Sequence, residues 1–72
     1  KKDKFIQKKA LERIKLFRED PFNVLLNNHA LAGEYENRRS FNVTGDYRIM
    51  FYYVKENKVV FVDIGTHPEL YE

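Results

Sequence analysis

The sequence predicts an α+β domain in which one N-terminal amphipathic helix packs on a twisted three-stranded antiparallel sheet. Two observations lead to this fold class. The first twenty residues repeat apolar side chains at helical spacing, and the second half of the chain contains three runs of β-branched and aromatic residues joined by short turns. With 72 residues, only about 60% of the surface of the unfolded chain can be buried, so one small core is expected.

The helix is expected from Lys2 to about Glu19. Apolar side chains recur there at intervals of three or four residues, with Lys, Arg and Glu between them, which is the pattern of a helix with one buried face: Ile6, Ala10, Ile14 and Phe17. Asp3 is a possible N-cap. Pro21 ends the helix, because the residue before a proline is pushed out of the helical region.

The rest of the chain predicts a short helical turn followed by a loop at 22–32, and then three strands at 35–43, 46–55 and 58–66. The connections between these strands contain two residues each, which favours an antiparallel meander. The tail at 67–72 is too short for independent structure, so it either lies against the sheet or remains loose.

Alternation along the strands predicts which side chains share a face. The middle strand would carry Asp46 and Arg48 on one face and an apolar set on the other: Tyr47, Ile49 and Phe51. In the last strand, one face would hold Val60, Val62 and Ile64, and the other Phe61, Asp63 and Gly65. One helix cannot also cover Met50, Tyr52 and Tyr53, so the second face of the sheet should be covered or bind something.

Composition excludes several classes of protein. The sequence has no Cys, so it has neither a disulfide framework nor a thiolate metal site, and nothing points to an oxidising compartment. No apolar run approaches the roughly 20 residues of a membrane span, and a cytoplasmic protein without a membrane partner is expected. The net charge of +2 is uneven, because residues 1–20 carry eight Lys and Arg against four Asp and Glu. Such a basic stripe suits a polyanion such as RNA, or is simply a solvated helix surface.

Several side chains could act on an RNA strand. Cleavage by the RNA's own 2′-hydroxyl needs a base, an acid and cations, and no metal ion. Candidate proton carriers are His29, Asp46, His67 and Tyr71, and candidate phosphate binders are Arg39 and Arg48. Each type has a structural alternative: a loop histidine is usually a surface residue, an aspartate after glycine bonds backbone amides or pairs with a nearby arginine, and a terminal tyrosine anchors a tail. Paired arginines such as Arg38-Arg39 also protect an edge strand from aggregation.

Three stretches of the chain resemble the RelE/ParE superfamily of bacterial toxins, the small partners in type II toxin–antitoxin pairs. They are residues 29–33 (HALAG), 39–49 (RSFNVTGDYRI) and 62–71 (VDIGTHPELY), in family order and with family spacing. The helix that ends at residues 19–22 (EDPF) is also similar to the family, so the resemblance covers nearly the whole chain. It implies one RelE-like domain over residues 1–72.

This resemblance implies a ribosome-associated endoribonuclease that cuts mRNA in the decoding site, uses no cofactor and forms a small hetero-oligomer with its cognate antitoxin. Arg48 matches the family arginine that stabilises the scissile phosphate, and His67 lies where YafQ-like members place a catalytic histidine. Tyr71 matches the C-terminal aromatic that stacks on the base or assists proton transfer. His29 and Asp46 match further acid/base positions of the YafQ-like branch, and Arg39 matches a basic position in RelE. Arg39 and its neighbour Arg38 are therefore the expected RNA-binding residues.

Three departures from the family leave other functions open. Asn42 stands where YafQ-like members can carry a histidine, and Asp63 replaces a basic residue. The chain also begins partway through the family's second helix, as if the N-terminal strand and first helix were absent. A decayed toxin that only binds its antitoxin is therefore one alternative. Another is a ParE-like toxin that poisons DNA gyrase, because the same fold serves both branches.

Overall fold

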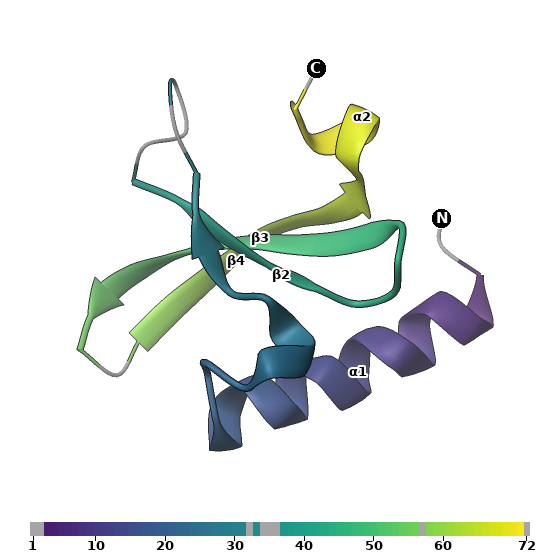
Figure 1. Ribbon diagram of the computed structural model, residues 1–72, viewed down its shortest axis with the longest axis horizontal. Coiled ribbons are helices and arrows are strands. Elements are labelled where there is room, and N and C mark those ends of the chain that lie inside the picture. Colours follow the sequence, from purple (N-terminus) through teal and green to yellow (C-terminus); the bar gives the residue numbers. More distant parts are fainter. Residues whose placement is uncertain (1–2, 32, 34–36, 57, 72) are drawn as a thin grey trace.

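The computed structural model describes residues 3–31, 33, 37–56 and 58–71, with the side chain of Tyr71 outside the description. Along the chain the elements are α1 (Lys4–Glu19), the 3-10 turn η1 (Val24–Leu26), β1 (His29–Ala30), β2 (Arg39–Asn42), β3 (Tyr47–Lys55), β4 (Lys58–Thr66) and α2 (His67–Tyr71). The strands form one antiparallel sheet in the order β1-β2-β3-β4. The sheet lies between the two helices, with α1 across one face and α2 against the other (Figure 1). These are called the α1 face and the α2 face below.

The predicted α+β class is confirmed, but the sheet has four strands instead of three. The extra strand, β1, lies in the segment predicted as a loop, where His29 pairs with Ser40 and Ala30 with Arg39. Two residues are too few to show an alternation in the sequence, so this strand is defined only by its pairing with β2. Residues 35–36, also expected in a strand, lie outside the described part of the chain, and β2 as described begins at Arg39.

The helix α1 begins at Lys4, directly after the predicted cap at Asp3 and two residues later than the expected start at Lys2, and it ends at Glu19 as expected. The Asp3 carboxylate accepts a hydrogen bond of 2.9 Å from the backbone N–H of Ile6, which caps the first turn. The last helical residue is Glu19, and the N–H of Asp20 donates to the Leu16 carbonyl at 2.8 Å. Neither of the helices that the structure describes is long and apolar enough to cross a membrane.

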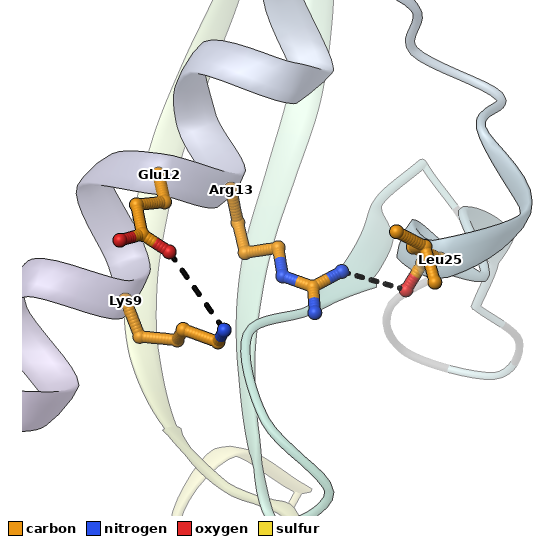
Figure 2. A network of polar contacts seen from close by, with 4 residues as sticks. All are labelled: Lys9, Glu12, Arg13 and Leu25. Atoms are coloured by element: carbon orange, nitrogen blue, oxygen red, sulfur yellow. Dashed lines mark hydrogen bonds and ion pairs between the residues drawn. The ribbon is translucent and has the colours of Figure 1, made fainter.

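Arg13 ties α1 to the segment that follows it. Its guanidinium donates to the Leu25 carbonyl of η1 at 3.2 Å, as Figure 2 shows. On the same helix, Lys9 and Glu12 form an ion pair of 3.7 Å that is open to solvent. Exposed polar contacts of this kind contribute little to stability, so the position of α1 depends mainly on its buried side.

The core lies between α1 and the sheet and is built from aromatic rings. Phe17 of α1 stacks on Phe41 of β2 with 4.9 Å between ring centroids, and it meets Phe51 of β3 edge-on at 4.9 Å. Phe41 and Phe51 are fully buried together with Leu26 of η1, and Ile49 belongs to the same cluster. Aromatic pairs in these geometries stabilise a core beyond the area they bury. The α1 face of the sheet is therefore the structural face.

The last strand, β4, departs from simple alternation at Val62. Opposite Met50 stands Asp63, but opposite Phe51, the next residue of β3, stands Phe61. Val62 is therefore the extra residue of a β-bulge, at which two residues of one strand oppose one of the other. From this point toward the start of β4, every side chain lies on the face opposite to the one that strict alternation predicts.

The expected faces of the last strand are therefore wrong on the N-terminal side of the bulge. Phe61, expected on the face opposite Ile64, turns to the α1 face, where it lies at the edge of the core, 39% exposed, with its ring centroid 6.0 Å from that of Phe17. Val60, expected beside Ile64, pairs with Tyr52 on the α2 face instead. Period-two alternation in a sequence cannot show an inserted residue, because the inserted valine is as apolar as its neighbours.

The C-terminal tail lies against the sheet as the short helix α2. Thr66 and Glu69 form a capping box: the N–H of Thr66 donates to the Glu69 carboxylate at 2.8 Å, and the N–H of Glu69 donates to the Thr66 hydroxyl at 3.4 Å. Leu70 is buried where α2 meets β4. A Cβ atom at Gly65 would lie 2.7 Å from a Glu69 carboxylate oxygen, so the lack of a side chain there lets α2 approach the sheet.

Candidate functional site

The α2 face carries polar side chains along the two central strands. Cross-strand pairing places Asn42 opposite Arg48 and Ser40 opposite Met50, and Tyr52 follows two positions further along β3. These positions alternate with the core residues of the α1 face, as the sequence predicts for Arg48. The sheet therefore separates a structural face from a face that is free to carry chemistry.

Three buried polar atoms on this face have no hydrogen-bond partner among the described residues: Ser40 Oγ, Asn42 Oδ1 and Arg48 Nε. A buried donor or acceptor left without a partner costs about 1–3 kcal/mol, which is why such atoms are rare in folded proteins. All three lie at adjacent positions on two paired strands. Several buried polar atoms without hydrogen-bond partners, close together in one part of a fold, are typical of a site that binds a ligand.

Arg48 is half-buried and forms no ion pair within the part of the chain that the structure describes. Asp46, expected to pair with it or to act as a proton carrier, is exposed in the turn before β3, where its N–H donates to the Thr44 hydroxyl at 3.2 Å. The partner of Arg48 on β4 is Gly65, which presents no side chain to the guanidinium. A partly buried cation without a counter-ion favours an anionic ligand.

The helix α2 brings His67 to the end of the sheet at which Arg48 lies. His67 is the first residue of the helix, directly after Thr66, and its side chain is exposed. Thr66 pairs with Tyr47, the residue before Arg48, so α2 starts beside the beginning of β3. Tyr71 is the last residue of α2, but its side chain lies outside the described part of the chain.

His29 reaches the α2 face from the opposite edge of the sheet. It pairs with Ser40, which pairs with Met50, so two strand spacings of about 4.8 Å each separate it from β3. Its ring Nδ1 lies 2.7 Å from the Asn27 carbonyl oxygen. A carbonyl oxygen only accepts hydrogen bonds, so Nδ1 carries the proton and Nε2 of the neutral ring is left as an acceptor. The two histidines therefore lie on opposite sides of the central strands.

The two arginines expected to bind RNA turn to opposite faces. Arg39 turns to the α1 face, where its Nε donates to Asn28 Oδ1 at 2.8 Å and its guanidinium carbon lies 5.4 Å from the Phe22 ring centroid. Arg38 turns to the α2 face and lies over side chains of β3. Of this pair, only Arg38 shares a face with Arg48.

Two features of the site are absent from the expectations drawn from the sequence. The position of Ser40 next to Arg48 depends on the register of β2 against β3, which a single sequence does not show. The capping box that fixes α2 was visible as a Thr followed three residues later by a Glu, Thr66 and Glu69, which is a known signal of a helix start.

The fold is similar to that of several solved structures, some of which are described as bacterial toxins. YafQ from E. coli strain BL21(DE3) superposes with a TM-score of 0.78 at 18% sequence identity, over 92% of this chain and 74% of that one. A YoeB/ParE toxin from Agrobacterium tumefaciens gives a TM-score of 0.72 at 18% identity, over 90% and 77% of the two chains. A copper-bound mutant toxin from Helicobacter pylori gives 0.67 at 21% identity, over 97% and 76%. At these identities the likeness shows a shared fold.

The family follows from the sequence of the whole chain. Residues 1–72 match the family described as the bacterial toxin of type II toxin-antitoxin system, YafQ. The protein belongs to this family of type II toxins, which confirms the resemblance found in the sequence and implies an antitoxin as its partner. A comparison with curated proteins found no match.

Proposed function

We propose that the protein is a toxin that cleaves mRNA on the ribosome, in the cytoplasm, with the α2 face as its active site. The observation that supports this most directly is Arg48, whose buried Nε–H has no partner and no counter-ion among the described residues. A phosphate group offers both the negative charge and the acceptor oxygens that this guanidinium lacks. Membership of the YafQ toxin family supports the same class of function.

The reaction we infer is attack of an RNA 2′-hydroxyl on the adjacent phosphorus. As the new O–P bond forms, a base takes the proton of the hydroxyl group. As the bond from phosphorus to the 5′-oxygen breaks, an acid gives that oxygen a proton. The products are a 2′,3′-cyclic phosphate and a 5′-hydroxyl, and protons and charge balance without a metal ion or cofactor.

The residues of the α2 face divide these tasks. Arg48 stabilises the negative charge that develops on the phosphorane. His67, at the start of α2, is the first candidate for proton transfer, because α2 begins beside the strand that carries Arg48. His29, with its acceptor Nε2, is the second candidate, and Asp46 and Tyr71 are further proton carriers in this proposal.

The test is cleavage of mRNA on translating ribosomes, mapped by primer extension. Arg48→Ala and His67→Ala should each lower the rate by about 100-fold or more, because each removes a group used mainly in the transition state. Arg18→Ala is the matched control, since it removes an exposed arginine of α1 and should cleave at nearly the wild-type rate. Intact mRNA with the wild type, or equal losses in Arg48→Ala and Arg18→Ala, would contradict the proposal.

A decayed toxin is the second candidate. Asp63, exposed on the α2 face opposite Met50, places a negative charge where RNA phosphates would approach, and Asn42 cannot transfer protons as a histidine does. Expression in a bacterial host without antitoxin separates the candidates, because unimpaired growth would support the decayed toxin. Growth arrest with intact mRNA and inhibited supercoiling by DNA gyrase would instead indicate a ParE-like toxin.

A further inference from the structure

We propose that Tyr52 and Arg38 form a second RNA subsite on the α2 face, which stacks one nucleobase of the strand whose scissile phosphate lies at Arg48. This inference rests on the proposed RNA-cleaving function. Tyr52 lies four residues beyond Arg48 along β3, a Cα separation of about 13 Å. The stacked base therefore belongs to a nucleotide a short way along the strand from the cut.

Arg38 and Tyr52 already stand together as a cation over an aromatic ring. The guanidinium carbon of Arg38 lies 5.9 Å from the Tyr52 ring centroid, and its Nη1 lies 3.6 Å from Met50 Sδ. Both Arg38 and Tyr52 are half-buried, so each is held in place and keeps accessible surface. Aromatic rings and planar guanidinium groups are the surfaces on which bases of single-stranded RNA stack.

Within the described residues, the hydrogen-bonding capacity of Arg38 is largely unused. A guanidinium has five N–H donors, and the acceptor that Arg38 meets among the described residues is a thioether sulfur, which accepts weakly. No described carboxylate pairs with it. Its neighbour Arg39, by contrast, is engaged by the amide oxygen of Asn28 at 2.8 Å. Arg38 therefore has donors left for a phosphate next to the stacked base.

The charges around Tyr52 set how an RNA strand would lie. Arg38 stands on the β2 side of the ring, and Asp63 exposes its carboxylate on the β4 side, opposite Met50. Val60, which pairs with Tyr52, is apolar and 39% exposed. Phosphates are attracted to the β2 side and repelled from the β4 side. The sugar–phosphate backbone is thus expected along Arg38, and the base over Tyr52 and Val60.

Tyr53 offers a matched control for the experiment. It follows Tyr52 on β3, is 42% exposed and turns to the α1 face, where its ring lies 5.5 Å from that of Phe51. Binding of a short, labelled, 2′-O-methylated RNA strand, which cannot be cleaved, is measured by fluorescence anisotropy at low salt. Tyr52→Leu should weaken binding about tenfold, whereas Tyr52→Phe and Tyr53→Leu should change it by less than about twofold.

Abasic nucleotides then identify the stacked base. Removal of the base at one position of the oligonucleotide should weaken binding by the wild type about tenfold. Removal of the same base should not weaken binding by Tyr52→Leu any further. Arg38→Gln should reduce the slope of log Kd against log salt concentration by about 0.7, because one phosphate contact to a single strand is lost. The abasic series on the wild type alone decides the point if Tyr52→Leu does not fold.

The outcomes separate this subsite from the active site. Equal affinities of Tyr52→Leu and Tyr53→Leu, with weaker binding by Arg48→Ala, would overturn the subsite and leave the proposed active site intact. An abasic series in which no position stands out, or a wild type that binds no RNA at low salt, would also overturn it. Cleavage on ribosomes, and its loss in Arg48→Ala, would then still decide the proposed function separately.

Discussion

Gly65 allows a direct test of how α2 is held against the sheet. Gly65→Ala adds one methyl group, whose carbon would lie 2.7 Å from Glu69 Oε1 and 3.2 Å from Glu69 Cβ. A carbon atom does not approach an oxygen so closely without repulsion, so the Glu69 carboxylate must move. The φ angle of Gly65 lies outside the left-handed region, so alanine adds no backbone strain of its own.

The loss of stability in Gly65→Ala follows from the hydrogen bond that the Glu69 carboxylate loses when it moves. Its displacement breaks the 2.8 Å hydrogen bond from the Thr66 N–H to Glu69, which closes the capping box of α2. Loss of a helix cap costs about 0.5–2 kcal/mol. In a domain of this size 1 kcal/mol corresponds to about 4–8 °C, so Tm should fall by about 2–16 °C. Thermal unfolding measures the fall, and faster amide hydrogen exchange at Thr66 reports the broken bond.

Two further variants make the test of α2 specific. Gly45→Ala is the matched control, because a Cβ atom there meets no atom within 4 Å and its φ is also outside the left-handed region. In a Glu69→Ala background the displaced carboxylate is absent, so Gly65→Ala should cost less than it does in the wild type. The reasoning would be refuted if Gly65→Ala and Gly45→Ala unfolded at the same temperature. It would also be refuted if Gly65→Ala lowered Tm as much in the Glu69→Ala background as it does in the wild type.

Three other positions test the core, the helix cap and the charge of the α2 face. Phe41→Ala should lower the free energy of unfolding in urea by about 3–5 kcal/mol, because its ring is fully buried against Phe17, and a loss below about 1 kcal/mol would contradict that packing. Asp3→Ala should lower the free energy of unfolding by about 0.5–2 kcal/mol, and Asp3→Asn should lower it much less, because the Asn side-chain oxygen can accept the hydrogen bond from the Ile6 N–H as Asp does. Equal losses in the two variants would argue against the cap. Asp63→Asn should strengthen RNA binding in the anisotropy assay at low salt and lose this gain at high salt, because it removes a repelling charge. An unchanged affinity at low salt would mean that RNA does not approach that side of the face.

Much of the fold could be predicted because it depends on local patterns. The apolar period of α1 and the cap at Asp3 set the helix, and the runs at 47–55 and 58–66 set the hairpin of β3 and β4. The strand β1 could not be predicted, since its two residues have no period of their own and are defined by pairing with β2. The bulge at Val62 was also invisible, because only the pairing with β3 reveals an extra residue.

The candidate site was harder to predict because it depends on strand register. The family resemblance pointed to Arg48 and His67. Which of Arg38 and Arg39 shares a face with Arg48 depends on the pairing of β2 with β3, and a shift of one residue would exchange them. The unpaired Nε of Arg48 and the buried hydroxyl of Ser40 arise from side-chain packing, for which a single sequence carries no pattern.

The bulge in β4 also affects the exposed edge of the described sheet. Within the described sheet β4 is an edge strand, and Val60, Phe61 and Val62 are each 38–39% exposed along it. A long, straight, apolar edge would be a template on which another chain could add a strand. The extra residue at Val62 bends and twists the strand at its most apolar point, so its outward backbone groups do not form one continuous row. Within the described sheet, the residue that disrupts the alternation of β4 thus also makes this edge a poorer template for strands of other chains.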